Sequence, residues 1–229
     1  MWASEKKMRK IILNFPLYAG VLDLEILLED GSVVTPFEYE NKKKIVCYGT
    51  SILQGCSSSH PGVATTNAVS RYFAQEVINY GFSGAAFMEK EVAEVIASRP
   101  DEDMEMLIID AEANAGMSMN LYNNFENFIE IIYKSHPNLP LVIMNRIRST
   151  YDGEYPNHYE GHELCDRVMK DVVERYQKKG KNIRFVDNWS LFDPSDTEFT
   201  IEGLHPTDSG MKVLTDQYIK VIKEVKGIK

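Results

Sequence analysis

The order of apolar and polar positions changes near residue 44 of this 229-residue chain. From there, short apolar runs alternate with longer stretches of helical period, a pattern typical of a parallel sheet flanked by helices. The expected strands are 45–48, 77–79, 106–110, 141–144 and 183–186, and the expected helices are 66–76, 89–97, 121–135, 159–177 and 207–226. We therefore predict an α/β fold in which five parallel strands form the middle layer of a three-layer αβα sandwich.

The residues before position 44 break this rhythm. Residues 22–28 form a β-like run, residues 29–32 have the composition of a hairpin turn, and Val33 and Val34 follow. This pattern predicts a short antiparallel β-hairpin, which is too small to hold a core of its own. We therefore divide the chain into an N-terminal hairpin extension, 1–43, and a main domain, 44–229.

Charge and hydropathy limit the partners that the chain can have. The formal net charge of -9 disfavours nucleic acid and anionic membrane surfaces, since both require clustered Lys and Arg. No apolar run approaches the ~18 residues that span a bilayer, and residues 1–10 are too charged for the apolar part of a signal peptide. The sequence therefore favours a cytoplasmic protein. A periplasmic or secreted location stays open if an export signal precedes it, and the oligomeric state is not indicated.

Cysteine and histidine spacing gives no sign of a disulfide framework or a metal site. The three cysteines, Cys47, Cys56 and Cys165, are odd in number, and their spacing fits neither a disulfide framework nor a zinc motif. His158 and His162 share one face of an expected helix, but no third ligand lies at a clear spacing. We expect neither a metal nor a cofactor.

A serine and a histidine about 150 residues apart carry the candidate chemistry. Ser51 directly follows the first expected strand, at the edge of the sheet where open α/β folds bind their ligands. Glu202 lies three residues before His205. A serine hydroxyl needs an imidazole to remove its proton, and the imidazole needs a third group to orient it. These residues can fill the three roles, although Thr50 and Ser51 can also be read as caps of the next helix.

Two other glycine-flanked motifs are excluded. Gly49 and Gly55 bracket five residues, but no Gly-Lys-Ser/Thr follows, so the segment is not a phosphate-binding P-loop. The segment also lacks the second glycine of the G-x-S-x-G elbow of α/β-hydrolases.

Four short blocks, in order, carry a resemblance to a known family. They are Gly49-Thr50-Ser51 for the family's G-D-S, Asn79 to Gly84 for its second block, Glu112-Ala113-Asn114-Ala115 for G-x-N-D, and Glu202-Gly203-Leu204-His205 for D-x-x-H. On these blocks the chain resembles the SGNH hydrolases, also called GDSL-type esterases and lipases, from about Lys44 to the C-terminus. The resemblance implies a flavodoxin-like fold and a serine esterase that uses no cofactor.

The resemblance also assigns roles to individual residues. It implies that Ser51 is the nucleophile, His205 the general base and Glu202 the orienting acid. The backbone N–H groups of Ser51 and Gly84 and the side chain of Asn114 then form the oxyanion hole. The chain departs from the family pattern at Thr50, Ala115 and Glu202, each of which replaces an Asp. Glu202 has a longer arm by one methylene, so an adjacent backbone carbonyl is an alternative partner for the imidazole.

The expected substrate is a small-molecule or carbohydrate ester. Family analogy, and the lack of a long apolar stretch suited to a lipid chain, favour removal of acetyl groups from a carbohydrate. A thioesterase, a short-chain lipase and a catalytically impaired carbohydrate-binding homologue are the alternatives. Glu112 and His60 are candidate substrate-binding residues, although Glu112 reads equally well as a solvated loop carboxylate. The chain further resembles a bacterial subgroup in which a β-rich module precedes the hydrolase, with 1–43 as its tail.

Overall fold

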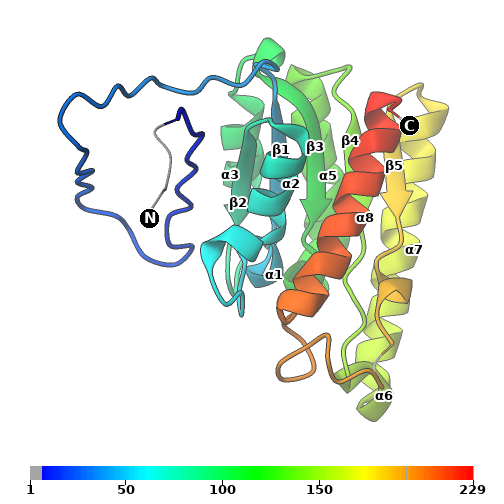
Figure 1. Cartoon of the computed structure of the whole chain (residues 1–229). Helices are drawn as coiled ribbons and strands as arrows, with labels where there is room; N and C mark the ends of the chain where they lie inside the picture. Colours follow the sequence, from blue (N-terminus) through cyan, green and yellow to red (C-terminus); the bar gives the residue numbers. More distant parts are fainter. Residues whose placement is uncertain (1–6, 194, 229) are drawn as a thin grey trace.

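Five parallel strands form one sheet at the centre of the protein (Figure 1). The computed structural model describes residues 7–193 and 195–228. In chain order the strands are β1 (Lys44–Gly49), β2 (Val77–Gly81), β3 (Met104–Asp110), β4 (Leu141–Met144) and β5 (Ile183–Val186). They lie side by side in the order β2-β1-β3-β4-β5, and every pair is parallel. The predicted five-stranded parallel sheet is confirmed.

Eight α-helices and three 3₁₀ turns connect the strands in the described part of the chain. The α-helices are α1 (Ser51–Gln54), α2 (Thr65–Phe73), α3 (Lys90–Ala97), α4 (Glu112–Ala115), α5 (Asn120–Ser135), α6 (Tyr151–Glu154), α7 (Pro156–Lys178) and α8 (Asp208–Lys226), and the 3₁₀ turns are η1 (Pro61–Val63), η2 (Asp101–Asp103) and η3 (Trp189–Leu191). The five predicted helices are present, with ends that differ by a few residues. The sequence did not predict α1, α4 and α6, because four residues are too few to give a helical period.

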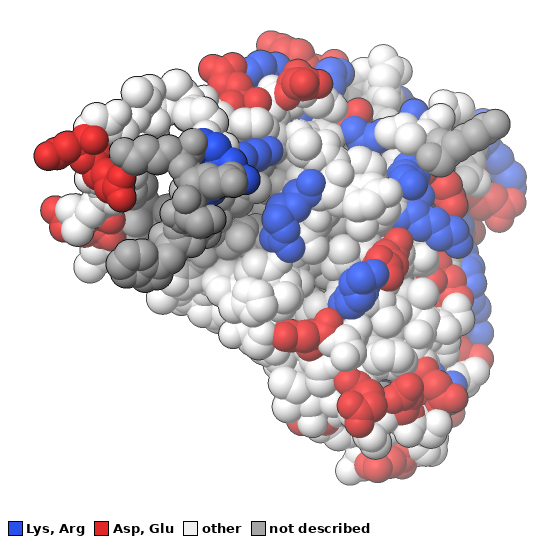
Figure 2. All heavy atoms as spheres, in the orientation of Figure 1, with Lys and Arg blue, Asp and Glu red and all other residues white. Residues whose placement is uncertain are grey.

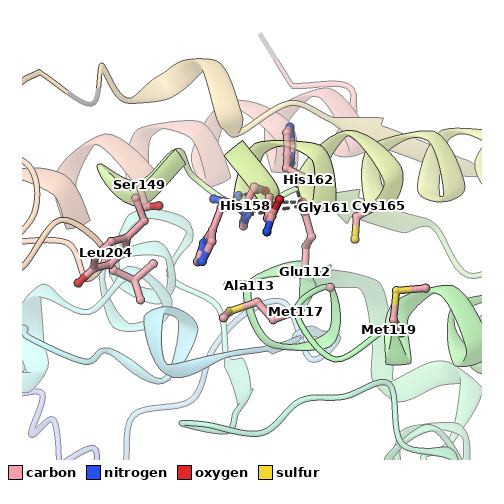
Figure 3. Close-up of a pocket in the computed structure, with 14 residues that line it drawn as sticks. Glu112, Ala113, Met117, Met119, Ser149, His158, Gly161, His162, Cys165 and Leu204 are labelled. Carbon is pink, nitrogen blue, oxygen red and sulfur yellow. Dashed lines mark hydrogen bonds and ion pairs between the residues drawn. The ribbon is translucent and has the colours of Figure 1, made fainter. Parts of the chain in front are cut away.

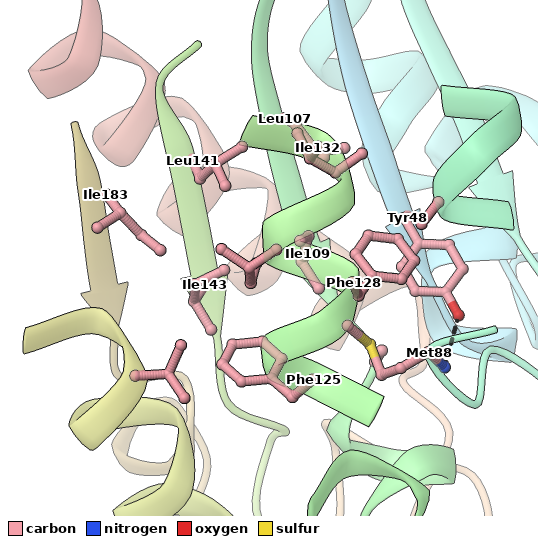
Figure 4. Close-up of a cluster of buried hydrophobic side chains, with 14 of the residues drawn as sticks. Tyr48, Met88, Leu107, Ile109, Phe125, Phe128, Ile132, Leu141, Ile143 and Ile183 are labelled. Carbon is pink, nitrogen blue, oxygen red and sulfur yellow. Dashed lines mark hydrogen bonds between the residues drawn. The ribbon is translucent and has the colours of Figure 1, made fainter. Parts of the chain in front are cut away.

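Side chains of the strands alternate between two cores, one on each face of the sheet. The core shown in Figure 4 packs α3, α5 and α7 on strand residues Val46, Tyr48, Leu107, Ile109, Leu141, Ile143 and Ile183. The opposite core packs α2 and α8 on Ile45, Cys47, Met106, Ile108, Val142 and Met144. This period-2 alternation in strands that are buried on both faces is the physical basis of the three-layer sandwich.

Residues 7–43 contain no strand or helix, so the predicted N-terminal hairpin is not confirmed. Only its turn is present, where the Ser32 N–H donates to the Glu29 carbonyl at 3.0 Å. Leu22 and Leu27 are 103% and 87% exposed, which leaves the run 22–28 without a packing partner. A turn motif alone does not hold two strands together in water. In Figure 1 this segment is an open loop beside the β2 edge of the sheet; the division into 1–43 and 44–229 stays a prediction.

The strand order 2-1-3-4-5 places a topological switch point between β1 and β3. Chains leave these two neighbouring strands toward opposite faces of the sheet, so a crevice forms at their carboxyl ends, and ligands of open α/β folds bind there. Ser51 follows β1 and Asn114 follows β3. The fold therefore brings residues from two distant parts of the sequence to one edge.

The face of the protein seen in Figure 2 carries charged side chains of both signs. Basic side chains there lie scattered among acidic ones, in accord with the net charge of -9. Among the described residues, no helix combines the length and the apolar character needed to cross a bilayer.

Candidate active site

Ser51, His205 and Glu202 form a hydrogen-bonded chain beyond the carboxyl end of β1. The Ser51 Oγ and the His205 Nε2 are 2.9 Å apart, and the His205 Nδ1 is hydrogen bonded to the Glu202 Oε1. The same carboxylate oxygen accepts the backbone N–H of His205 at 3.2 Å. Ser51 is 7% exposed, whereas the His205 and Glu202 side chains are 23% and 44% exposed. The hydroxyl is thus sheltered, and its imidazole partner lies at the surface.

Local structure fixes the backbone at both ends of the Ser51–His205–Glu202 series of hydrogen bonds. Thr50 caps α1 by accepting the Ile52 N–H with its side chain, so the capping reading of Thr50 and the catalytic reading of Ser51 are compatible. On the other side, Thr207 caps α8 by accepting the Gly210 N–H at 3.2 Å. The carbonyl of His205 accepts the Ile201 N–H at 2.9 Å, which closes the turn that carries Glu202.

The loop after β2, residues 82–88, lies against the end of β1. The Phe82 N–H donates to the Gly49 carbonyl at 2.9 Å. Three residues of the loop have left-handed backbones, with φ of +68° at Gly84, +64° at Ala86 and +61° at Met88. For the two that are not glycine, this conformation costs on the order of 1 kcal/mol each. The loop therefore needs firm anchors.

Tyr48 supplies one anchor of this loop. Its hydroxyl donates to the Glu89 carboxylate at 2.6 Å and accepts the Met88 N–H at 2.9 Å. Glu89 also accepts the Phe87 N–H, at 2.9 Å. Burial, together with the neighbouring Glu89, raises the pKa of Tyr48 above its usual range, so the hydroxyl keeps its proton and continues to donate.

Gly84 and Asn114, the two further residues expected in an oxyanion hole, are linked through this loop. The Asn114 side-chain amide donates to the carbonyl of Ala85, the residue after Gly84. An amide nitrogen carries two hydrogens, so one N–H remains after this bond. Within the described residues, neither Gly84 nor Asn114 is hydrogen bonded to Ser51. Gly84 follows β2 and Asn114 follows β3, so both lie at the carboxyl edge of the sheet, as Ser51 does.

Glu112 is a buried network residue rather than a solvated loop carboxylate. It is 2% exposed. Its Oε2 accepts the Arg146 backbone N–H at 2.8 Å, and its Oε1 lies 2.8 Å from the His162 Nδ1. Each carboxylate oxygen of Glu112 thus has a hydrogen-bond partner, and Glu112 links the segment after β4 to α7.

Arg146 extends this network to α6. Its guanidinium makes two hydrogen bonds to the Asp152 carboxylate, at 2.7 and 2.5 Å, and lies 4.7 Å above the Trp189 ring. Burial would raise the pKa of Asp152, but Arg146 and the backbone and hydroxyl of Ser149 outweigh it and lower that pKa. Asp152 therefore stays ionised, and the positive charge of Arg146 is compensated.

A cavity of about 350 Å³ opens between α4, α6 and α7 (Figure 3). Leu204, the residue before His205, and Ala113, the residue before Asn114, are both in its wall. Its lining residues are Glu112, Ala113, Gly116, Met117, Met119, Arg146, Ser149, Tyr151, Asn157, His158, Gly161, His162, Cys165 and Leu204. Burial raises the pKa of Cys165 to about 12, so its thiol is a neutral wall group and no nucleophile.

His60 is not part of the Ser51–His205–Glu202 chain. Its Nδ1 lies 2.8 Å from the Ser59 hydroxyl, which in turn donates to Asp208 at 2.6 Å. This contact ties the loop after α1 to the first residue of α8. Among the described residues, no cluster of His, Cys, Asp and Glu could hold a metal ion.

A second buried carboxyl lies at the end of β3. Burial, with a further contribution from Glu112, raises the pKa of Asp110 to about 7. Its Oδ2 accepts the Tyr218 hydroxyl from α8 at 3.1 Å. Asp110 thus packs under the site without a charged partner.

The sequence analysis missed Arg146 and Trp189, and it considered His162 only as a metal ligand. The Trp189 ring stacks on the His162 ring, with centroids 3.6 Å apart and planes 2° apart. The available signal was the position of Arg146, two residues after β4, on the strand end next to that of β3. Polar residues at that edge are candidates for the site wall.

A parallel α/β sheet with a serine, a histidine and a carboxylate linked at its carboxyl edge is the arrangement of hydrolases that use a serine nucleophile. The sequence model of the GDSL-like lipase/acylhydrolase family matches residues 42–223. The chain belongs to this family.

Solved structures share the fold. A Bacteroides ovatus protein assigned as a GDSL-like lipase is 31% identical, with a TM-score of 0.74; the match covers 82% of this chain and 55% of that one. A salicylyl-acyltransferase from a tetracycline biosynthetic pathway is 19% identical (TM-score 0.68; 82% and 56% covered). A two-domain esterase active on acetylated mannans, co-crystallised with mannopentaose, is also 19% identical (TM-score 0.61; 81% and 50% covered).

The chain spans just over half the length of the first two of these proteins. No curated protein matches the sequence.

Proposed function

We propose that the protein hydrolyses carboxylic acid esters through an acyl-enzyme on Ser51. The observation that carries the proposal is the 2.9 Å separation of the Ser51 Oγ and the His205 Nε2. At this distance the imidazole can accept the hydroxyl proton as the oxygen attacks a carbonyl carbon. Membership of the GDSL-like lipase/acylhydrolase family supports the same reaction class.

The proton path follows from the tautomer of His205. A hydrogen bond from Nδ1–H to the Glu202 carboxylate leaves a lone pair on Nε2, which faces Ser51. Glu202 then stabilises the imidazolium formed in the first step. His205 returns the proton to the leaving alcohol, and in the second half of the reaction it activates the water that releases the acyl group.

The oxyanion of the tetrahedral intermediate needs donors that are already in place. We assign this role to the backbone N–H groups of Ser51 and Gly84 and to the N–H of Asn114 that is not bonded to Ala85. The bond from Asn114 to the Ala85 carbonyl supports the assignment, because it holds two of the donors in one unit. Each such donor is worth about 3 kcal/mol in the transition state.

We infer that the substrate is an acetylated carbohydrate. A structural neighbour with the same fold is an esterase active on acetylated mannans. The site is open on the His205 side, where Glu202 is 44% exposed, so a bulky hydrophilic alcohol has room to approach. Acetate would be the acid product, and the deacetylated sugar the alcohol product.

The cavity next to Leu204 favours a second candidate, an enzyme for longer or aromatic acyl groups. At about 350 Å³ it is far larger than an acetyl group requires, and two methionines, Met117 and Met119, line it. Its charged groups are already paired with one another, so it suits an uncharged ligand. A short-chain lipase or thioesterase with the same catalytic residues would use this space.

Hydrolysis of p-nitrophenyl acetate by the purified chain tests the serine mechanism. We expect Ser51→Ala to lose activity, and Ser58→Ala to keep it, because the Ser58 hydroxyl makes no hydrogen bond within the described residues. Activity that survives Ser51→Ala would exclude the acyl-enzyme. Acetylated mannan and a series of acetyl, butyryl and octanoyl esters then separate the two candidate substrates.

A further inference from the structure

The N-terminal segment contacts the loop that follows the candidate nucleophile. The Leu17 carbonyl accepts a hydrogen bond from the Gln54 Nε2 at 3.0 Å. The Leu17 side chain covers Gly55, since a Cβ on that glycine would lie 2.5 Å from the Leu17 Cδ1. The Tyr18 hydroxyl interacts with the side chains of Ser83 and Cys56. A segment without secondary structure thus lies against the first turn of α1 and against the 82–88 loop.

Gln54 joins the two partners of this contact. While its nitrogen donates to Leu17, its Oε1 accepts the Ser83 N–H at 2.8 Å. An amide side chain offers one acceptor oxygen and one donor nitrogen, and here both are used. Ser83 directly precedes Gly84, so the bond fixes the peptide next to the proposed oxyanion donor.

Close packing leaves the backbone of Gln54 little freedom to shift. A Cβ on Gly81, the last residue of β2, would stand 2.3 Å from the Gln54 N. Asn79 reinforces this contact: its side chain donates to the Leu53 carbonyl at 3.0 Å and accepts the Gly81 N–H at 2.8 Å. The position of Gln54 relative to the loop is therefore set by backbone contacts, and its side chain is the adjustable link.

The 82–88 loop, which Gln54 contacts through Ser83, has a strained backbone. Left-handed conformations at Ala86 and Met88 cost free energy, which the anchors from Tyr48, Gly49 and Gln54 offset. Loss of one anchor allows the backbone near Gly84 to move toward a lower-energy conformation. Displacements of about 1 Å in a catalytic group can cost on the order of 100-fold in rate.

We propose that Gln54 is a positioning residue through which Leu17 holds the Gly84 N–H in the geometry that the oxyanion requires, with Tyr18 acting beside it on Ser83. The N-terminal segment then belongs to the catalytic architecture of the protein, although none of its side chains takes part in the chemistry. This inference rests on the proposed esterase function.

Gln54→Ala tests the role of the link in the full chain. We expect kcat for p-nitrophenyl acetate to fall about tenfold or more, with KM changed less than twofold, since the loss concerns the transition state alone. Gln75→Ala is the matched control. The Gln75 side chain also makes hydrogen bonds with both its nitrogen and its oxygen, to the Lys43 carbonyl at 2.6 Å and to the Lys226 ammonium at 2.7 Å. It lies, however, at the amino ends of the strands, away from Ser51. The Gln75→Ala substitution should lower the melting temperature and leave kcat unchanged.

Rescue separates positioning from general stability. Gln54→Glu keeps an acceptor for the Ser83 N–H and loses the donor to Leu17, so its kcat should lie between those of wild type and Gln54→Ala. Leu17→Ala keeps the carbonyl that accepts from Gln54 but removes the side chain that packs on Gly55 and holds this carbonyl in place. It should therefore lower kcat in the wild-type background and have little further effect in the Gln54→Ala background, because both changes act on one link.

Three results would overturn the inference: wild-type kcat in Gln54→Ala, an equal loss of kcat in Gln75→Ala, or independent effects of Leu17→Ala and Gln54→Ala. None of these affects the proposed function, which fails only if Ser51→Ala remains active.

Discussion

Thr150 and Gly203 are in direct backbone contact: the Thr150 N–H donates to the Gly203 carbonyl at 2.9 Å. Gly203 lies between Glu202 and His205 in sequence and has a φ of +83°. A Cβ at this position would stand 1.9 Å from the Thr150 Oγ1. The loop after β4 therefore packs so closely on the turn of the candidate acid and base that only glycine fits.

Gly203→Ala should displace this turn and separate His205 from Ser51. We expect kcat to fall at least tenfold, from both the left-handed backbone and the overlap with Thr150. Steady-state kinetics on p-nitrophenyl acetate measures the loss. Gly153→Ala is the control, because a Cβ there meets no atom within 4 Å and its φ is not positive; an equal loss in both variants would contradict the prediction.

Glu202→Gln should lower kcat substantially with little change in KM. A neutral amide can still accept a hydrogen bond from the His205 Nδ1, but it no longer stabilises the imidazolium that forms in the transition state. Glu198→Gln serves as a control for a carboxylate in the same loop. Wild-type turnover in Glu202→Gln would mean that another group orients His205.

Asp110→Asn should make stability less dependent on pH. The folded-state pKa of Asp110 is about 7, against about 3.9 for an unfolded Asp. The neutral carboxyl of Asp110 therefore contributes fully to the free energy of unfolding below pH ~4. This contribution is lost as pH rises through about 7, and the loss is on the order of 4 kcal/mol at most. Asn keeps an acceptor for the Tyr218 hydroxyl and has no charge to bury.

Thermal melting at several pH values measures this effect. Between pH 5 and pH 8, wild-type stability should fall more than that of Asp110→Asn. Asp216→Asn, an exposed change on the helix that carries Tyr218, should keep the wild-type slope. Parallel curves for wild type and Asp110→Asn would show that Asp110 is ionised throughout.

Gly161→Leu should narrow the cavity and change ester selectivity. Gly161 lines the cavity, and a Cβ there meets no atom within 4 Å. If longer acyl groups use this space, kcat/KM for octanoyl esters should fall about tenfold relative to acetyl esters, as expected for lost room in an apolar pocket. Gly161→Ala adds helix propensity without filling the space, so it should keep the wild-type ratio. An unchanged ratio in Gly161→Leu would place the acyl group elsewhere.

The sheet and its long helices were predictable because their signals are local and periodic. Runs such as 141–144 are apolar throughout, as a strand covered on both faces must be, and the helices repeat their apolar positions over many turns. The prediction of an N-terminal hairpin was not confirmed for a related reason. Its turn is local and present at Glu29 and Ser32, but strand pairing needs packing partners, which these residues lack among the described contacts.

The candidate site was predictable only where a residue belongs to a motif at a strand end or before a helix; Arg146 stands at a strand end but in no such motif. Ser51, Asn114 and the turn of His205 follow strands or precede a helix, so their position in the fold was apparent from the sequence. Arg146 and Gln54 depend on tertiary contacts, with Asp152 in one case and with Leu17 and Ser83 in the other. No pattern in the neighbouring sequence announces such bonds.

The separation of Ser51 from its imidazole partner by 154 positions affects how the protein matures. A nascent chain that has reached position 200 already contains Ser51, the 82–88 loop and all five strands, but not His205. The imidazole reaches Ser51 only when α8 packs Tyr218, Val221 and Ile222 against the sheet. Nucleophilic reactivity should therefore appear only once α8 has been made and has packed on the sheet, and a chain truncated before α8 should be inert toward esters even if it is compact.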